Sequence, residues 1–475
     1  METTIHFGTD GWRAVMNDRF IFGNVRLVAQ AIATFLIKEK RSSQGVAVGY
    51  DARFMSERFA QEVCSVLAGN GIPCYLPARD IPTPLTAYSI VDKQTAGAVM
   101  ITASHNPSEY NGMKFMPWYV SPAGPEITSK IEAELATLEH NGVRAASPSS
   151  AEYRNLVQPM DTWPAYARHI GTLLKPPQSR HRVVVDPMYG SGRGYLKDAL
   201  ADRGASVEEI HGWRDPLFGG SSPEPSAESL RELSERVKET GADLGLAGDG
   251  DADRFGVVDR DGAYVTPNQI IALLLWHLVK NRGWKGPVVR TVTVTHLVDA
   301  IARDLGLDLV ETPVGFKWVG EVMREQGAVL GGEESGGLSV KGHIPEKDGI
   351  LANCFALEMV DTAGASLGEQ LEVLFKKYGR FYNGRANVRV SEEAKAELMK
   401  RLTQDPPQTL AGKRLVEVNR KDGAKLIFDD QSWLLARPSG TEDMVRIYLE
   451  AHTQEDLAAL KQALSKTYSA LLPPL

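Results

Sequence analysis

Hydrophobic positions along this chain follow two periods in turn. Between residues 21 and 37, apolar side chains recur at the spacing of one helical face, which predicts an amphipathic helix. Short apolar runs at 45–50, 94–102 and 182–186 predict strands. Later strand patterns at 287–294, 307–311 and 327–330 are separated by helical patterns at 295–304 and 316–325. This alternation predicts α/β layers.

The last part of the chain has a different pattern. From residue 388 onward we expect a strand, a Glu/Lys-rich helix, a strand pair and a final helix at 454–471, which together form a smaller α+β module. Polar or turn-rich stretches at 140–150, 281–287 and 378–387 mark plausible seams. A chain of 475 residues is too long for one hydrophobic core. We therefore predict four domains, at 1–150, 151–283, 284–380 and 381–475.

Composition narrows the class of protein. Hydrophobic residues make up 43% and charged residues 24% of the chain, as in ordinary globular proteins. A formal net charge of −7 argues against nucleic acid or an anionic membrane as the main partner, although focused Arg and Lys side chains still suit a small anionic ligand. The three cysteines form no CxxC pair, the N-terminus shows no apolar signal segment, and the longest apolar run, 270–276, is far shorter than the roughly 20 residues of a spanning helix. We expect a cytoplasmic protein.

Four apolar runs each end in a polar or glycine-rich loop. The loops begin with the letters ASHN after residue 102, GDGDADR after 247, GGEESGG after 330 and RPSGTE after 436. Open α/β sheets bind ligands at the carboxyl ends of their strands. Each of the four domains is therefore expected to contribute one loop to a shared cleft.

The second loop has the most specific pattern. Asp249, Asp251 and Asp253 are two residues apart, so on an extended backbone their side chains share one face. Three converging carboxylates require a cation, and hard oxygen ligands select Mg²⁺, Mn²⁺ or Ca²⁺ over Zn²⁺. An EF-hand is excluded because Arg254 and Arg260 occupy its glycine and glutamate positions. The remaining alternative is an acidic, solvated turn.

The other loops are ambiguous when each is taken alone. Ser104 has no GxSxG elbow around it, so the motif taken singly is more often a capping or turn serine. On an extended loop, Glu333 and Ser335 would face the same way and suit sugar hydroxyls, but in isolation a flexible surface loop is the default interpretation. The segment 437–441 suits a phosphate but also fits a type II or Asx turn. A dinucleotide fingerprint is excluded at 190–195, because Tyr195 replaces its third glycine, and no P-loop motif occurs.

Taken together and in this order, the four loops resemble the α-D-phosphohexomutase superfamily, and most of all its phosphoglucomutase/phosphomannomutase family. The motifs are TASHNP at 102–107, DGDADR at 249–254, GEESG at 332–336 and RPSGT at 437–441. The opening GTDGWR at 8–13 also resembles the family, and the likeness runs along essentially the whole chain. It implies three related α/β domains with mixed sheets between helices, plus a C-terminal α+β lid domain.

The resemblance also implies a reaction and a set of site residues. Ser104 would carry a phosphoryl group and exchange it with a hexose monophosphate through a bound bisphosphate such as glucose 1,6-bisphosphate. One Mg²⁺ would be held by Asp249, Asp251, Asp253 and the Ser104 phosphoryl oxygen. The resemblance places Arg13, Lys114 and Arg254 near the transferring phosphoryl group. Glu333 and Ser335 would hold sugar hydroxyls. The phosphate that does not react would be held by Arg437, Ser439, Gly440 and Thr441.

The sugar is read, in the family, by a loop that resembles residues 313–320, with Gly315, Phe316 and Lys317 as candidate contacts. With GEES and residues 346–349, this loop looks more like glucose-preferring members. Lys347 and His105 compete for the role of general acid or base. Three departures are Gly337 in place of a frequent histidine, Asp443 in place of a frequent proline and Asp10 in place of a frequent serine.

The expected function is therefore interconversion of hexose 1-phosphate and hexose 6-phosphate, most of all of glucose. A phosphomannomutase and a metal-dependent sugar phosphatase are the alternatives, and a non-catalytic sugar-phosphate sensor is a weaker one. The expected ligands are small sugar phosphates. No nucleic acid or membrane partner is expected, and the protein is expected to be a monomer or a dimer.

Overall fold

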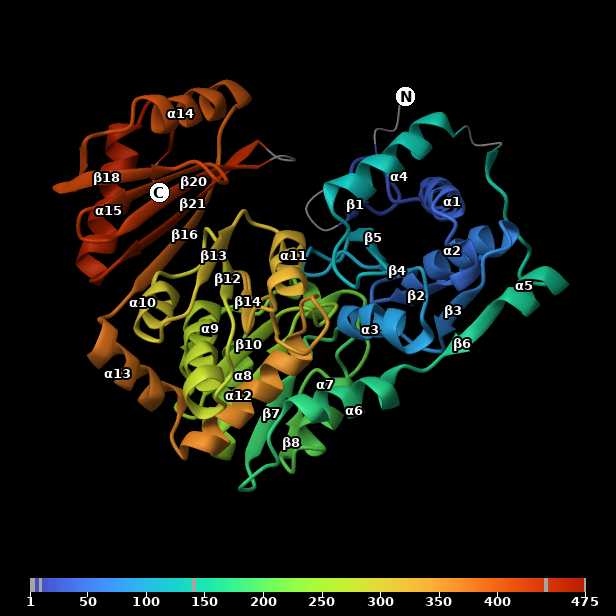
Figure 1. The fold of residues 1–475 in the computed structure, drawn as a ribbon, viewed down its shortest axis with the longest axis horizontal. Coiled ribbons are helices and arrows are strands. Elements are labelled where there is room, and N and C mark those ends of the chain that lie inside the picture. The colour runs from blue at the N-terminus through green and yellow to red at the C-terminus, as the bar shows by residue number, and fades with distance from the viewer. Residues whose placement is uncertain (1–4, 8–10, 139–141, 440–442, 474–475) are drawn as a thin grey trace.

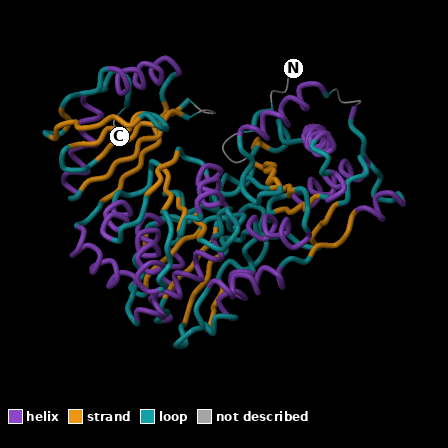
Figure 2. The backbone as a smooth tube through the Cα atoms, in the orientation of Figure 1, coloured by secondary structure: helices purple, strands orange, loops and turns teal. Residues whose placement is uncertain are grey.

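The computed structural model describes the chain apart from residues 1–4, 8–10, 139–141, 440–442 and 474–475. Four sheets follow one another along the described residues (Figure 1). The N-terminal and C-terminal domains lie at opposite upper corners of the view, and the two middle domains lie between and below them. Helices pack beside the strands of each sheet (Figure 2). The predicted combination of three α/β domains with mixed sheets and one smaller domain is confirmed.

The first sheet is mixed and has the strand order β1-β5-β4-β2-β3-β6. Its central strands β2 and β4 are parallel and buried along their whole length, as expected for strands covered on both faces. The strands are β1 (Trp12–Val15), β2 (Val46–Tyr50), β3 (Cys74–Pro77), β4 (Gly97–Ile101), β5 (Tyr110–Pro117) and β6 (Val157–Met160). The helices are α1 (Phe22–Lys38), η1 (Ser42–Gln44), α2 (Ser56–Gly69), α3 (Thr83–Lys93), α4 (Pro125–Thr137) and α5 (Ala151–Leu156). Because β6 pairs with β3, this sheet continues past residue 150, where we ended the first domain.

The second sheet has the order β11-β10-β9-β7-β8. Its strands are β7 (Arg182–Asp186), β8 (Ser206–Glu209), β9 (Leu244–Gly248), β10 (Phe255–Asp259) and β11 (Tyr264–Val265). The helical segments are α6 (Trp163–Leu173), α7 (Tyr195–Ala201), η3 (Phe218–Gly220) and α8 (Arg231–Thr240). The antiparallel pair β9 and β10 is joined by the loop that carries the three aspartates.

The third sheet has the order β13-β12-β14-β15. Its strands are β12 (Val288–Thr291), β13 (Leu309–Thr312), β14 (Leu330–Gly332) and β15 (Leu338–Val340). The helical segments are α9 (Pro267–Trp276), η4 (His277–Asn281), α10 (Leu297–Asp304), α11 (Phe316–Gln326), α12 (Gly349–Ala363) and α13 (Leu367–Tyr378). One apolar core runs through the first three domains, because Met100 of the first, Val185 of the second and Phe355 of the third belong to the same cluster. This shared core fixes the aspartate loop relative to the third domain.

The C-terminal domain has its own core and a sheet of order β16-β21-β20-β19-β18-β17, all antiparallel. Its strands are β16 (Tyr382–Arg389), β17 (Thr409–Leu410), β18 (Lys413–Asn419), β19 (Ala424–Phe428), β20 (Trp433–Pro438) and β21 (Met444–Ala451). The helices are α14 (Glu392–Gln404) and α15 (Gln454–Thr467). We expected one pair of strands between the two helices of this domain, and this was wrong, because five strands lie between α14 and α15. We missed β18 because most of its residues are exposed or half-buried, which leaves little hydrophobic pattern.

Within the described ranges, no single helix is long and apolar enough to cross a membrane. Helices α12 and α13 reach the required length and apolarity only as a pair, and a 77° bend separates them.

Candidate active site

Ser104 lies three residues after the end of β4, in the loop that leaves the first sheet. Its side chain is 1% exposed and its backbone has the left-handed φ of 52°. The hydroxyl Oγ donates to Asp249 Oδ2 at 2.8 Å, across 145 residues of sequence. His105 Nδ1 lies 3.3 Å from the same Oγ. The structure therefore joins the serine loop of the first domain to the aspartate loop of the second.

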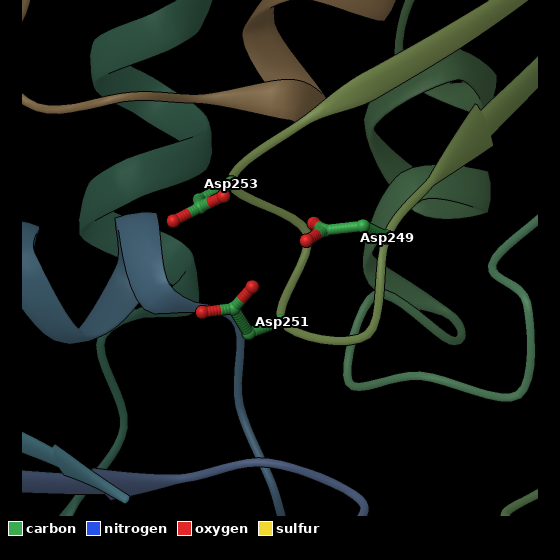
Figure 3. Close-up of side chains that lie close together, drawn as sticks. All are labelled: Asp249, Asp251 and Asp253. Carbon is green, nitrogen blue, oxygen red and sulfur yellow. The ribbon is translucent and has the colours of Figure 1, made fainter. Parts of the chain in front are cut away.

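The three aspartates converge as expected. Figure 3 shows their carboxylates pointing toward one another from the loop between β9 and β10. One oxygen from each lies within 4.8 Å of the others, and all three residues are buried. The reason we gave was wrong, because the loop is not extended. Ala252 adopts a φ of 56° and its N–H donates to the Asp249 carbonyl at 3.0 Å, so a tight turn brings the side chains together.

Two lysines from other domains reach this cluster. Lys114, on β5, places Nζ 2.9 Å from Asp251 Oδ2 and 2.9 Å from Asp253 Oδ2. Lys347, in the third domain, places Nζ 3.3 Å from Asp253 Oδ2. Burial and the charge of Asp251 oppose ionisation of Asp253, but the charges of Lys114, Lys347 and Arg254 together outweigh them and lower its pKa. Asp249 has the opposite balance, since burial and the charges of its two aspartate neighbours raise its pKa well above the usual value.

The aspartate cluster fits a hard divalent cation. Oδ1 of Asp253 is buried and has no hydrogen-bond partner among the described residues, and a buried carboxylate oxygen without a partner is costly. The start of α3 holds the neighbouring ligand in place, because Thr83 Oγ1 donates to Asp251 Oδ2 at 2.6 Å. Three anionic oxygens that converge in this way suit Mg²⁺. We assign Asp249, Asp251 and Asp253 as the residues that would hold it.

Other cations surround the serine loop. Arg13, on β1, donates from a terminal guanidinium nitrogen to Asn106 Oδ1 at 2.7 Å. Arg254 donates to Glu224 Oε1 at 3.2 Å, while its Nε is buried without a partner among the described residues. Loss of hydration, then the charges of Arg254, Arg13 and Lys114, holds the pKa of His105 well below its usual value. The imidazole is therefore neutral near pH 7.

The sugar loop and the GEES segment meet at the start of α11. Gly315, with a φ of 127°, donates its N–H to Glu333 Oε1 at 2.9 Å. We expected Glu333 and Ser335 to share a face of an extended loop, and this was wrong. Glu333 N–H donates to the Gly337 carbonyl at 2.9 Å and Gly336 N–H donates to the Glu333 carbonyl at 3.1 Å, so the segment is a tight turn. Glu333 is buried at its start, and Ser335 is half-buried.

Lys347 passes directly over Gly337. A Cβ at position 337 would lie 2.5 Å from Lys347 Cδ and 2.8 Å from Lys347 Cγ. The lysine is 5% exposed, and its Nζ lies 5.6 Å from the centre of the Phe316 ring and 3.5 Å from Glu346 Oε1. Lys317 directly follows Phe316 in the sequence, and its Nζ lies 5.5 Å from the centre of the Trp318 ring. The absence of a side chain at residue 337 therefore leaves room for the lysine.

The phosphate loop is tied to the sugar loop through Asp422. Arg437, on β20, donates Nε to Asp422 Oδ2 at 2.7 Å, and Val314 of the sugar loop donates its N–H to the same oxygen at 2.9 Å. Ser439 is buried and donates its N–H to the Met444 carbonyl. Gly440 and Thr441, which complete the predicted phosphate site, lie outside the described residues.

Sequence reasoning missed several residues that hold these loops. Asp51 and Arg53, directly after β2, hydrogen-bond to the serine loop, and Asp422 joins the two C-terminal loops. The signal for Asp51 and Arg53 was present, because the run at 45–50 ends in Asp-Ala-Arg at the same edge of the sheet as the serine loop. Asp422 has no such signal, since it lies in a polar turn before β19.

Comparison with known proteins agrees with this geometry. Family models described as phosphoglucomutase/phosphomannomutase match the chain four times: alpha/beta/alpha domain I over residues 4–142, domain II over 164–262, domain III over 266–378 and the C-terminal domain over 386–467. A "probable phosphoglucosamine mutase" of Pyrococcus abyssi is 34% identical over 466 residues, covering 97% of each chain.

Two further relatives carry different names. A "phosphoglucomutase/phosphomannomutase" of Thermococcus kodakarensis is 30% identical, covering 94% of this chain and 95% of its own. The crystal structure of a "putative phosphomannomutase" from Thermus thermophilus superposes with a TM-score of 0.85 at 31% identity, over 99% of this chain and all of the other. With four loops from four matched domains, this chain belongs to the phosphoglucomutase/phosphomannomutase family and is an enzyme of the phosphohexomutase type.

Proposed function

We propose that this enzyme interconverts glucose 1-phosphate and glucose 6-phosphate through a phosphoserine at Ser104. The observation that carries the proposal is the 2.8 Å contact between Ser104 Oγ and Asp249 Oδ2, because it places the hydroxyl directly against a cluster suited to Mg²⁺. Glucose 1,6-bisphosphate is the proposed intermediate and activator. The proposed ligands are thus small sugar phosphates.

The proposed reaction needs two phosphoryl transfers. In the first, the bond between phosphorus and Ser104 Oγ breaks as a bond to the free sugar hydroxyl oxygen forms; the proton of that hydroxyl passes to a base, and the released Ser104 Oγ takes up a proton. In the second, after the bisphosphate has turned over, the bond between its other phosphorus and the sugar oxygen breaks as a bond to Ser104 Oγ forms; the serine gives up its proton, and the released sugar oxygen takes up a proton. Mg²⁺, when bound by Asp249, Asp251 and Asp253, supplies positive charge against the phosphoryl oxygens.

The chain's own residues supply the remaining charge and the proton transfer. Lys114 contacts two of the three aspartates. Arg13 and Arg254 are proposed to donate to the phosphoryl oxygens while the phosphoryl group transfers. These groups would stabilise the transition state electrostatically, because they are already in place before the reaction. The neutral imidazole of His105 beside Ser104 is one candidate base. Lys347, buried between Asp253 and Glu346, is the other.

The remaining substrate contacts lie on the third and fourth domains. We propose that Glu333, Ser335, Gly315, Phe316 and Lys317 read the sugar, and that Arg437 and Ser439, with Gly440 and Thr441, hold the phosphate that does not react. The C-terminal domain is proposed to close over the substrate as a lid, because water that reaches the phosphoserine hydrolyses it.

A second candidate substrate is glucosamine phosphate. It is favoured by the names of relatives from Pyrococcus and Thermococcus. Glucose is favoured by the GEES sequence and by residues 313–320. The Thermus neighbour is named for mannose, which keeps mannose phosphate as the third substrate to compare.

The test compares kcat/KM for glucose 1-phosphate, glucosamine 1-phosphate and mannose 1-phosphate, with Mg²⁺ and a trace of the matching bisphosphate. We expect the highest value for glucose 1-phosphate and no turnover by S104A. A higher value for glucosamine 1-phosphate contradicts the glucose assignment but keeps the mutase. Release of inorganic phosphate without isomerised sugar supports a phosphatase instead. Full activity of S104A contradicts the proposal that Ser104 carries the phosphoryl group.

A further inference from the structure

We infer that Asp51 and Arg53 form a positioning pair that holds Ser104 in its reactive conformation. The inference rests on the proposed function in one respect, that Ser104 receives the phosphoryl group. Neither residue is a catalytic residue, because Arg53 acts through backbone carbonyls of the serine loop and Asp51 acts through Thr102 and Arg53.

Arg53 binds the serine loop through four backbone carbonyls. Its side chain is fully buried, and the two terminal nitrogens of its guanidinium each donate to two of these oxygens. The acceptors are the carbonyls of Ser104 at 2.6 Å, Asn106 at 2.6 Å, Pro107 at 2.7 Å and Tyr110 at 3.0 Å. The remaining donor, Nε, binds Asp51 Oδ2 at 3.1 Å. One planar cation therefore sets the course of the chain from residue 104 to residue 110.

Asp51 holds the other side of the serine. Its Oδ2 also accepts from Thr102 Oγ1 at 2.6 Å, and this hydroxyl in turn accepts from the Ser104 N–H at 2.8 Å. Its Oδ1 accepts from the Arg53 N–H at 3.0 Å and from Ser56 Oγ at 2.9 Å. Both backbone groups of Ser104 are thus fixed, the N–H through Thr102 and the carbonyl through Arg53.

The conformation of Ser104 explains why such a pair is needed. A φ of 52° lies in the left-handed region, which residues other than glycine seldom adopt unless the surrounding structure enforces it. In this conformation Oγ reaches Asp249 Oδ2. If the pair is lost, the backbone of Ser104 relaxes toward the extended region, and the hydroxyl leaves the aspartate cluster.

The second domain braces the pair from outside. Arg214 donates Nε to the Ala52 carbonyl at 3.0 Å and a terminal nitrogen to the Arg53 carbonyl at 3.1 Å. The ring of Phe218 lies 4.9 Å from Arg53 Cζ. The domain that carries the three aspartates therefore also contacts the residues that place Ser104 beside them.

The test substitutes Arg53 by lysine, which keeps the charge but cannot donate in a plane to four carbonyls. For R53K we expect kcat to fall at least 100-fold, with KM for the hexose phosphate within threefold of wild type, since the proposed contacts with the sugar and with the non-reacting phosphate lie on the third and fourth domains. The rate at which labelled bisphosphate phosphorylates Ser104 should fall in parallel. A merely structural role predicts instead that the folded fraction falls while turnover per folded molecule is kept.

The matched control is R290K. Arg290 is also buried, at 2% exposed, and is paired with Asp299 and Glu311 in the third domain. We expect it to lose thermal stability while kcat stays within threefold. R214A is a second variant for the case in which R53K does not fold, because Arg214 is 37% exposed and acts only from outside. For R214A we expect kcat to fall three- to tenfold with KM unchanged.

A folded R53K with kcat within threefold of wild type overturns the inference, as does a loss confined to KM. If R53K does not fold, unchanged kcat in R214A overturns it. A wild-type enzyme that forms no phosphoserine and does not turn over refutes the proposed function itself, which is a different result from an active wild type with an active R53K.

Discussion

Gly250 separates the first two aspartates, and the serine loop packs directly on it. A Cβ at this position would lie 2.6 Å from the Ser104 carbonyl oxygen and 3.0 Å from Pro223 Cγ. The loop around Gly250 cannot easily retreat, because its N–H donates to the Pro223 carbonyl and its own carbonyl accepts from the Ser191 N–H. We therefore predict that G250A pushes the serine loop away from the aspartates.

The size of the effect follows from the contact distance. Ordinary contact of a Cβ begins near 3.4 Å, so the two loops must separate by 3.4 − 2.6 = 0.8 Å. If the 0.8 Å is added along the hydrogen bond from Ser104 Oγ to Asp249 Oδ2, the distance between these atoms increases from 2.8 Å to 3.6 Å. This distance is outside the range of a hydrogen bond. A misplacement of about 1 Å lowers turnover on the order of 10²-fold, or about 3 kcal/mol in the barrier.

The assay measures kcat and KM of G250A with saturating Mg²⁺ and bisphosphate, together with thermal unfolding. The control is G171A, because Gly171 lies in α6 with no atom within 4 Å of an added Cβ; its activity should equal that of wild type. A G250A enzyme with unchanged melting temperature and kcat within threefold of wild type would refute the reasoning, since it would show that the two loops need not touch.

Three further predictions concern charge, metal and packing. Burial would raise the pKa of Glu311, but Arg290 and Lys425 lower it from 4.5 to about 2. Ionised Glu311 therefore stabilises the fold fully above pH 4.5, and this stabilisation is lost as the pH falls through 2. In E311Q the free energy of unfolding should depend less steeply on pH in this acid range, by at most about 3 kcal/mol, and an unchanged dependence contradicts the prediction. D253N should weaken Mg²⁺ binding at least tenfold, measured by calorimetry and by the Mg²⁺ dependence of kcat. If D253N and the wild type bind Mg²⁺ with equal affinity, Asp253 is not a metal ligand. F355A, at a fully buried ring in α12, should lose about 3–5 kcal/mol in denaturant unfolding, whereas F54A, at a 59% exposed ring, should lose less than about 0.5 kcal/mol.

The sequence by itself determined much of this protein. The strand and helix periods predicted β2, β4, β7, α1 and α11 close to their observed bounds, because hydrophobic spacing reports directly on the backbone period. The four loops lie at strand ends, as the break from apolar to polar residues indicated. The resemblance carried by the ordered motifs identified the family. The aspartate motif pointed to the buried cluster that could hold a metal, although a tight turn and not the two-residue spacing brings the carboxylates together.

Local sequence patterns could not decide which loop ends meet. The family resemblance implied a shared site, and only the tertiary structure decided the individual contacts. A polar residue after a strand is known to lie at the edge of its own sheet, but the sequence holds no local signal for the edge of another sheet that faces it. Ser104 meets Asp249, Lys114 crosses from β5 to two aspartates, and Asp422 joins the sugar and phosphate loops through domain packing. These contacts depend on shape and charge complementarity between separate folded units, which hydrophobic periodicity does not encode.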